Sequence, residues 1–211
     1  MGTNHMAKRS VLLISGGIDS PVAGAMMKRL EYELIALHLS QEPLTDDAAE
    51  RKSIELAKKI GCVKFITLKY GHQLAEISKN CNHRLFFILQ KRLMLRLAER
   101  IARDEGASAI ITGESLGQVG SQTLSNLATI STATTLPILR PLLCLNKQEI
   151  IARARELDTY NTSKGPEICN LLGPKHPATT SRLAFVEAEE AKIAVDNLIT
   201  HIIPTMIDRP L

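Results

Sequence analysis

Short runs of apolar residues alternate along the chain with longer segments in which apolar residues recur every three or four positions. The apolar runs, which predict buried strands, cover residues 11–14, 33–39, 63–68, 108–112 and 136–139. The amphipathic segments, which predict helices, cover residues 21–30, 46–60, 71–79, 84–105, 125–133, 146–157 and 182–203. This alternation predicts an α/β fold, with a doubly wound, mostly parallel sheet and helices on both of its faces.

Length and composition predict a single folded unit. The chain has 211 residues, of which 45% are hydrophobic, enough for a substantial core. Residues 1–8, which begin M-G-T-N-H-M, are expected to be a cloning remnant and a disordered start, and residues 9–211 a single domain. Residues 159–180 carry repeated Gly and Pro and predict a long mobile loop. The final helix has apolar residues that either dock onto the sheet or form a homodimer seam, namely Leu183, Val186, Ile193, Leu198 and Ile202.

Charge and aromatic content narrow the class of protein. The 26 basic and 22 acidic residues give a net charge of +4, too mild to demand a nucleic-acid partner. Aromatic residues make up 3% of the chain and Trp is absent, which argues against a base-stacking platform. No apolar run reaches the roughly 18 residues that suggest a membrane span. With no secretory signal either, the cytoplasm is the expected location.

The first predicted strand leads directly into a glycine-rich turn, S-G-G-I-D-S, at residues 15–20. A turn from a strand into a helix leaves backbone N–H groups unpaired, and the helix dipole adds positive charge there. Gly16 and Gly17 permit close approach of a ligand, and Ser15 and Ser20 offer hydroxyl donors. The turn therefore predicts an anion site, most simply for phosphate, although neither G-x-x-x-x-G-K-[ST] nor G-x-G-x-x-G is present. The alternative is an ordinary turn between a strand and a helix.

A second polar stretch follows the fourth predicted strand and reads G-E-S-L-G-Q-V-G-S-Q-T-L over residues 113–124. Gly113 would permit a nucleotide to approach, and Gln118 and Gln122 would supply amide hydrogen bonds. The carboxyl ends of parallel strands meet at one edge of a sheet, so this stretch should converge with the glycine-rich turn and the end of the second strand. The alternative is a flexible surface loop.

Four stretches together resemble the catalytic domain of the tRNA 4-thiouridine synthetase family, within the PP-loop ATP pyrophosphatases of the adenine nucleotide α-hydrolase-like group. They are S-G-G-I-D-S-P-V-A, K-R-L-M-L-R-L-A-E-R-I-A, T-G-E-S-L-G-Q-V-G-S-Q-T-L and R-P-L-L-C-L-N-K-Q-E-I-I, and the resemblance covers about residues 9–195. It implies an ATP-dependent sulfurtransferase that transfers AMP to the C4 oxygen of a uridine, with release of pyrophosphate. A persulfide or sulfide donor would then replace that oxygen with sulfur, giving 4-thiouridine.

The resemblance also implies roles for individual residues. Asp19 would be catalytic and would hold Mg²⁺. His38 and Leu39 would contact adenine through their backbone. The full set of implied ATP contacts is Leu13, Ile14, Ser15, Gly16, Gly17, Ile18, Ser20, His38, Leu39, Lys91, Gly113, Gln118 and Gln122. Without the resemblance, Asp19 is equally well a helix cap and Lys91 part of a solvated helix face.

Four widely spaced cysteines form no C-x-x-C motif. Cys169, in P-E-I-C-N-L-L-G-P, is similar to the sulfur-handling cysteine of the family and is the second implied catalytic residue, which would relay sulfur or resolve a persulfide. Lys164 and Lys175 would favour its thiolate. Some archaeal members of the family use a pair of cysteines with an iron–sulfur cluster. That arrangement is disfavoured here, because the position that matches the second cysteine falls near Leu172, where the chain has no cysteine. The other three cysteines are expected to be structural: Cys62, Cys81 and Cys144.

Two domains of full-length family members have no counterpart in the chain, the THUMP-containing tRNA-binding region and the rhodanese domain. The resemblance implies tRNA as the partner, and the missing tRNA-binding region leaves open whether it is bound directly or through a separate RNA-binding protein. Two other functions stay open. One is sulfur transfer for thiamine thiazole synthesis, and the other is a non-catalytic ATP-binding module that acts with a partner protein.

Overall fold

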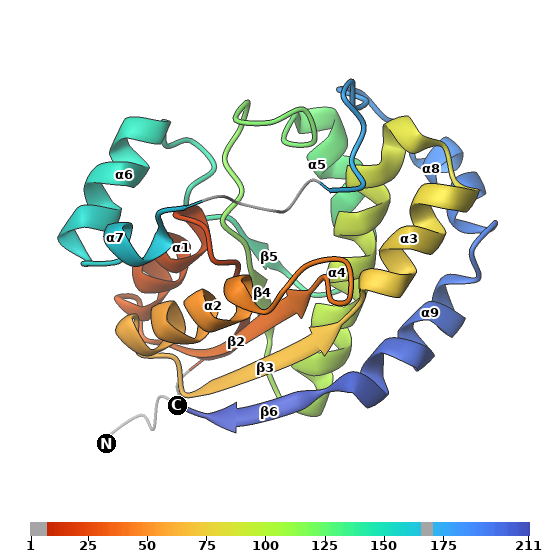
Figure 1. Cartoon of the computed structure of the whole chain (residues 1–211). Coiled ribbons are helices and arrows are strands. Elements are labelled where there is room, and N and C mark those ends of the chain that lie inside the picture. The colour runs from red at the N-terminus through yellow and green to blue at the C-terminus, as the bar shows by residue number, and fades with distance from the viewer. Residues whose placement is uncertain (1–7, 166–170) are drawn as a thin grey trace, which may run out of the picture.

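The computed structural model describes residues 8–165 and 171–211, so Cys169 lies outside the described residues. One six-stranded sheet has the order β5-β4-β1-β2-β3-β6 (Figure 1). All neighbouring strands pair in parallel except β6, which runs antiparallel to β3. The strands are β1 (Lys8–Leu13), β2 (Tyr32–Ser40), β3 (Lys64–Lys69), β4 (Ala109–Ile111), β5 (Ile138–Leu139) and β6 (Ile207–Pro210). Lys8 therefore belongs to the sheet and not to the expected disordered start.

Helices cover both faces of the sheet, which confirms the predicted doubly wound α/β architecture (Figure 1). On one face lie α1 (Asp19–Lys28), α2 (Ala48–Lys59), α6 (Lys147–Glu156) and α7 (Tyr160–Ser163). On the other lie α3 (Gly71–Asn80), α4 (Phe86–Asp104), α5 (Leu124–Ser131), α8 (Leu183–Glu190) and α9 (Val195–Ile202). Two 3₁₀ turns, at His83–Leu85 and Ile203–Thr205, precede α4 and follow α9. No helix in the described part of the chain is long and apolar enough to cross a membrane.

The two apolar layers meet across β1 at the centre of the sheet. Successive strand residues point to opposite faces, so Val11 enters the core beneath α4 while Leu12 enters the core beneath α1 and α2. Both side chains are fully buried. A near-continuous apolar run such as V-L-L-I is therefore what a strand covered on both faces requires.

The C-terminal segment differs from the single helix predicted over residues 182–203. It forms α8 and α9, separated by a turn in which Ala194 has a φ of 43°. Alanine favours helices, so nothing in the local sequence marks this break, and the turn allows both helices to contact α4. Four of the five apolar residues named for this segment are buried, which confirms that they dock onto the core: Val186, Ile193, Leu198 and Ile202. Leu183 is partly buried.

The strand β6 was not predicted because I-D-R-P contains two charged residues and a proline, which disfavour strands. It lies at the sheet edge, where such residues are tolerated. The segment 159–180 also contains more structure than the predicted loop, since α7 lies within it.

A buried ion pair ties α8 to α4. Arg92 is 1% exposed, and its Nε and Nη2 donate to the two carboxylate oxygens of Glu190 at 2.8 and 2.9 Å. Arg96 donates to the same carboxylate. Burial alone would raise the pKa of Glu190, but the hydrogen bonds from Arg96 and Arg92 bring that pKa below its usual value. Glu190 therefore stays ionised and binds two guanidinium groups, the buried one of Arg92 and the partly exposed one of Arg96.

We predict that Glu190→Gln lowers the free energy of unfolding by about 3 kcal/mol, because it leaves Arg92 buried without its counter-charge. Urea unfolding measures this loss. Because the pKa of Glu190 is lowered in the folded state, its contribution is present above the unfolded pKa of about 4.3 and is lost as the pH falls through the folded pKa. The matched control is Glu187→Gln at an exposed position of the same helix, with a loss within about 0.5 kcal/mol. Equal losses in the two variants would contradict the prediction.

Candidate active site

A cavity of about 850 Å³ opens at the carboxyl ends of β1, β2 and β4. Its walls come from the glycine-rich turn, the segments that follow β2 and β4, helices α2 and α4, and residues near 173–177. Asp19 and all but one of the predicted ATP contacts line it: Leu13, Ile14, Ser15, Gly16, Gly17, Ser20, His38, Leu39, Lys91, Gly113, Gln118 and Gln122. The exception is Ile18, which packs against the core beneath α1. The predicted convergence of the three strand ends at one crevice is therefore confirmed.

Ser20 closes the glycine-rich turn from inside. Its Oγ accepts a hydrogen bond from the N–H of Ser15 at 3.0 Å and donates to the Ser15 carbonyl at 3.2 Å. The hydroxyl that the sequence suggests for ligand binding is thus used to fix the turn, and Ser20 is buried. Another serine supports the turn from α7, since Ser163 Oγ donates to the carbonyl of Gly17 at 3.3 Å.

Asp19 lies in the first turn of α1 and lines the cavity. The N-cap of α1 is Ile18, and no side chain caps the helix, so Asp19 is not a cap. Its carboxylate accepts a hydrogen bond from Lys147 Nζ at 2.8 Å. Lys147 is not among the residues predicted from the sequence. The signal that could have found it is its place at the start of α6, directly after Asn146, which is the N-cap of that helix and forms a full capping box with Glu149.

Gly113 lets the segment after β4 lie directly on the start of α1. A Cβ at this position would lie 2.8 Å from the backbone nitrogen of Ser20 and 2.9 Å from the carbonyl carbon of Asp19. Gly113 lines the cavity, so its contact with a nucleotide stays a prediction, and the space that a Cβ would occupy is filled by the backbone of α1. The glycine is required by the packing of two site segments.

His38 uses its side chain internally. Its Nδ1 lies 3.1 Å from the carbonyl oxygen of Ile14 and 3.2 Å from Ser53 Oγ. Because a carbonyl can only accept, Nδ1 carries the hydrogen. Burial lowers the pKa of His38, while the bond to Ile14 acts in the opposite direction. The imidazole is therefore a neutral connection between β1, β2 and α2, and only the remainder of the residue is available to the cavity.

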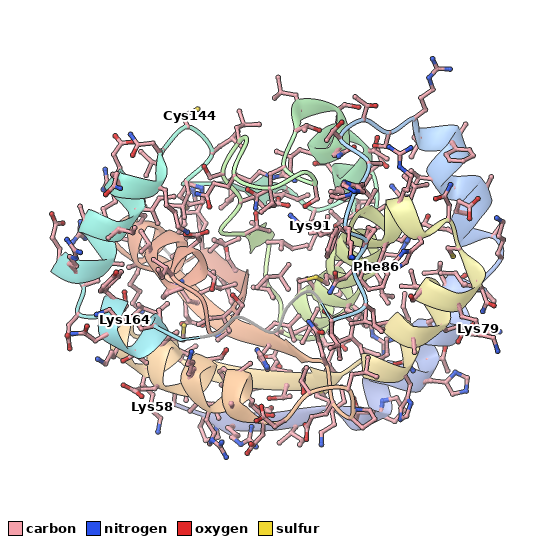
Figure 2. The ribbon with its side chains drawn as sticks, turned by 45° about the horizontal axis from the view of Figure 1, so that its top comes forward. Lys58, Lys79, Phe86, Lys91, Cys144 and Lys164 are labelled. Carbon is pink, nitrogen blue, oxygen red and sulfur yellow. The ribbon has the colours of Figure 1, made fainter. Side chains whose placement is uncertain are left out.

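A largely buried carboxylate in the cavity wall joins two cations. Glu114 Oε1 lies 2.7 Å from Lys91 Nζ, and Glu114 Oε2 lies 2.8 Å from Arg140 Nε. Burial alone would raise the pKa of Glu114, but the charges of Lys91 and Arg140 bring it below its usual value, so the carboxylate is ionised. Lys91 is not on a solvated helix face, since Figure 2 shows it in the interior, between α4 and the segment after β4.

Two side-chain amides of the loop after β4 each have one buried atom without a partner. Gln118 Nε2 and Gln122 Oε1 are buried atoms without a hydrogen bond in the described part of the chain. The loop itself is held in place, because Gly117 N donates to the Gln122 carbonyl at 3.0 Å and Asn126 Nδ2 donates to the Gly120 carbonyl at 2.9 Å. Buried amide groups on a fixed loop normally find a ligand or water as partner.

Lys52 is a further cation of the cavity that the sequence analysis does not predict. It projects from α2 beside the glycine-rich turn, and a Cβ at Gly16 would lie 3.3 Å from its side chain. Among the described residues, Lys52 forms no ion pair, in contrast to Lys91 and Lys147.

Asp19 is the carboxylate that the resemblance suggests for Mg²⁺, and it lines the cavity. The described residues contain no group of three or more His, Cys, Asp or Glu side chains that could hold a metal ion. A single carboxylate does fit Mg²⁺ that arrives with a nucleotide, because this ion commonly takes one or two carboxylates and completes its shell with phosphates and water.

The cysteines fall into two groups. Cys62 is buried, and burial raises the pKa of its thiol to about 12. Cys81 is half-buried with a pKa raised to about 11, again mainly by burial, and its Sγ donates to the Glu189 carbonyl at 3.4 Å. Both fit the predicted structural role. Cys144 does not, because it is an exposed free thiol at the outer margin of the molecule (Figure 2).

Comparisons with known proteins agree with this geometry. The model of the family described as "Thiamine biosynthesis protein (ThiI)" matches residues 5–195. The chain is 43% identical over 197 residues to "Probable tRNA sulfurtransferase" of Moorella thermoacetica, covering 90% of this chain and 50% of that protein. It is 41% identical over 199 residues to the protein of that name from Thermus thermophilus, covering 90% of this chain and 48% of that protein. The chain thus spans about half the length of the curated relatives it matches.

A solved structure shares the whole fold. A crystal structure described as a 4-thiouridine synthetase–RNA complex with bound ATP matches with a TM-score of 0.91 and 33% identity, over 96% of this chain and 55% of that chain. NMN synthetase from Francisella tularensis matches with a TM-score of 0.59 at 18% identity, a likeness that concerns the fold alone.

We predict that Gly113→Ala lowers the free energy of unfolding by about 1 to 3 kcal/mol, because the new methyl group meets backbone atoms that cannot move independently. Gly16→Ala is the matched control in the same cavity. There the nearest atoms are Lys52 Cβ and Cδ at 3.3 Å and the Ala49 carbonyl oxygen at 3.4 Å, all further away than the backbone atoms met at Gly113, and the loss should stay below about 1 kcal/mol. Urea unfolding measures the free energy of unfolding of both variants. The prediction is wrong if Gly16→Ala lowers it more than Gly113→Ala does.

Proposed function

This chain belongs to the thiamine biosynthesis protein (ThiI) family, and from that premise we propose that it is the catalytic domain of an ATP-dependent tRNA uridine 4-sulfurtransferase. It would adenylate the C4 carbonyl oxygen of a uridine and then replace that oxygen with sulfur, giving 4-thiouridine, AMP and pyrophosphate. The observation that carries the proposal is one cavity shared by the S-G-G-I-D-S turn and the G-E-S-L-G-Q loop, in a chain whose relatives are named tRNA sulfurtransferase.

The proposed nucleotide lies along the carboxyl edge of the sheet. Adenine would contact the backbone of His38 and Leu39, and the phosphates would take the N–H groups of the glycine-rich turn at the start of α1. Lys52, Lys91 and Lys147 bring positive charge to the same cavity. Asp19 would hold Mg²⁺, which neutralises charge on the triphosphate when it is bound.

The first proposed step is transfer of AMP. The C4 oxygen of the uridine attacks the α-phosphorus, the bond between the α- and β-phosphates breaks, and pyrophosphate leaves. Backbone donors of the turn would stabilise the negative charge that develops on the phosphate oxygens. An oxide is a poor leaving group and AMP is a good one, so adenylation prepares C4 for substitution.

The second proposed step is sulfur transfer. A persulfide or sulfide attacks C4, and AMP leaves with the former C4 oxygen. Cys169 would relay the sulfur or resolve the persulfide. The described residues on either side support this assignment, because Ser163 bonds to the glycine-rich turn, while the Leu172 carbonyl accepts a hydrogen bond from His83 Nε2 at 2.8 Å beside α4.

The substrate would be tRNA, bound directly or through a separate RNA-binding protein, and the reaction would take place in the cytoplasm. Thiamine thiazole synthesis is less favoured, because it is supported by the description of the family and not by the names of the relatives. A non-catalytic ATP-binding module is the other alternative.

We predict that the protein releases pyrophosphate from ATP and Mg²⁺ in the presence of unmodified tRNA, and that Asp19→Asn slows this release at least about a hundredfold. Cys169→Ser should still release pyrophosphate and bind AMP to the tRNA, but form no 4-thiouridine. Radiolabelled ATP and chromatography of the tRNA nucleosides measure the two steps.

The matched control is Cys144→Ser, which removes an exposed thiol outside the cavity and should leave both steps unchanged. ATP binding without pyrophosphate release under any of these conditions would contradict the proposed activity and favour the ATP-binding module. Full sulfur transfer by Cys169→Ser would contradict the role of that cysteine.

A further inference from the structure

Glu114 holds the one lysine of α4 that lines the cavity. The Glu114 side chain is 10% exposed, and the Lys91 side chain is 22% exposed. Both carboxylate oxygens are engaged, Oε1 by Lys91 at 2.7 Å and Oε2 by Arg140 Nε at 2.8 Å and by Thr112 Oγ1 at 3.2 Å. Each carboxylate oxygen of Glu114 therefore already accepts a hydrogen bond. A direct contact between this carboxylate and an anionic ligand would be repulsive.

Arg140 is the rear partner of this cluster. It does not line the cavity, and its Nη2 donates to Ser131 Oγ of α5 at 2.9 Å. Two cations share one carboxylate, so the cluster of Lys91, Glu114 and Arg140 carries one net positive charge. Without Arg140, the pair of Lys91 and Glu114 would be neutral and would offer little to a phosphate. With Arg140 in place, the ammonium group keeps its charge and a fixed position.

Four separate elements define that position. Lys91 comes from α4, Glu114 from the segment after β4, Arg140 from the residue after β5, and Ser131 from the end of α5. Glu114 lies three residues after the end of β4 and Arg140 directly after β5, so both groups are held close to the ends of strands. Placement of this kind affects reaction rates strongly, because misplacement of a group by about 1 Å can cost about a hundredfold in rate.

We propose that Glu114, supported by Arg140, is a positioning residue for adenylation: it holds the Lys91 ammonium where the phosphate charge develops as pyrophosphate leaves. The inference rests on the proposed ATP-dependent function and assigns the cluster a part in it. A lysine–glutamate pair of the same chemistry must be in place for phosphoryl transfer in protein kinases. Glu114 lines the cavity, but in this proposal it acts through Lys91 and not by contact with nucleotide or uridine.

Rate and affinity should respond differently to Glu114→Gln. Loss of the carboxylate raises the positive charge of the cluster, so ATP should bind as tightly as in wild type or more tightly. The ammonium loses its fixed position, so pyrophosphate release in a single turnover should slow by about tenfold to a hundredfold. A purely structural defect would weaken ATP binding and slow the reaction together.

The experiment is a double-mutant cycle with Lys91→Met, read by calorimetric ATP binding and by single-turnover pyrophosphate release with tRNA. If Glu114 acts through Lys91, adding Glu114→Gln to Lys91→Met slows release by less than about threefold. Full additivity of the two rate losses, or a folded Glu114→Gln protein with the wild-type rate, would overturn the proposal.

A second variant protects the test against misfolding. Glu114→Gln can leave Arg140 buried without a counter-charge, whereas Glu114→Gln/Arg140→Gln removes one charge of each sign. We expect the same slow release and retained ATP binding in this double variant, and a wild-type rate in it would also refute the proposal. Absence of pyrophosphate release from the wild type would instead refute the proposed function, so the two failures are distinguishable.

Discussion

β1 pairs in parallel with β2 along one side and with β4 along the other, and the rest of the site depends on this pairing. Parallel strands end at the same edge of a sheet, so the glycine-rich turn, the end of β2 and the segment after β4 necessarily meet. The close contact of Gly113 with the start of α1 completes this arrangement, because it leaves no space between two of the three segments. Strand order thus determines where the cavity lies, and the side chains determine its charge and its hydrogen-bonding groups.

Charge pairing organises the walls of the cavity. Lys147 is held by Asp19 and Lys91 by Glu114, so two cations in a partly dehydrated space have their counter-charges within the protein. An anionic ligand can share these cations without the cost of burying an unpaired charge, whereas a neutral ligand would gain nothing from them. The same chemistry, further from solvent, connects Arg92 to Glu190 and serves stability alone.

The sequence was sufficient to predict features that depend on local pattern. The buried strands, the alternation with helices and the cap at Asn146 follow from short-range periodicity and side-chain chemistry. The convergence of the motif residues on the cavity also follows, because topology places the strand ends together once the sheet is parallel, whereas Lys52 and Lys147 of the same cavity were not predicted.

Features that depend on distant partners could not be predicted from the sequence. The break at Ala194 and the edge strand β6 are imposed by packing against α4 and β3. The partners of Lys91 and Asp19 lie 23 and 128 positions away along the chain, so no local pattern reveals them. Exposure of Cys144 likewise depends on how its loop leaves the sheet, and the apolar neighbours in L-L-C-L suggest the opposite.

The most direct test of the account is a crystal structure of this chain with a non-hydrolysable ATP analogue and Mg²⁺. The account predicts the phosphates on the turn at residues 15–20, the adenine against the backbone of His38 and Leu39, and Lys147 shared between Asp19 and a phosphate oxygen. An analogue bound elsewhere, with the pair of Lys147 and Asp19 unchanged and the turn empty, would contradict it.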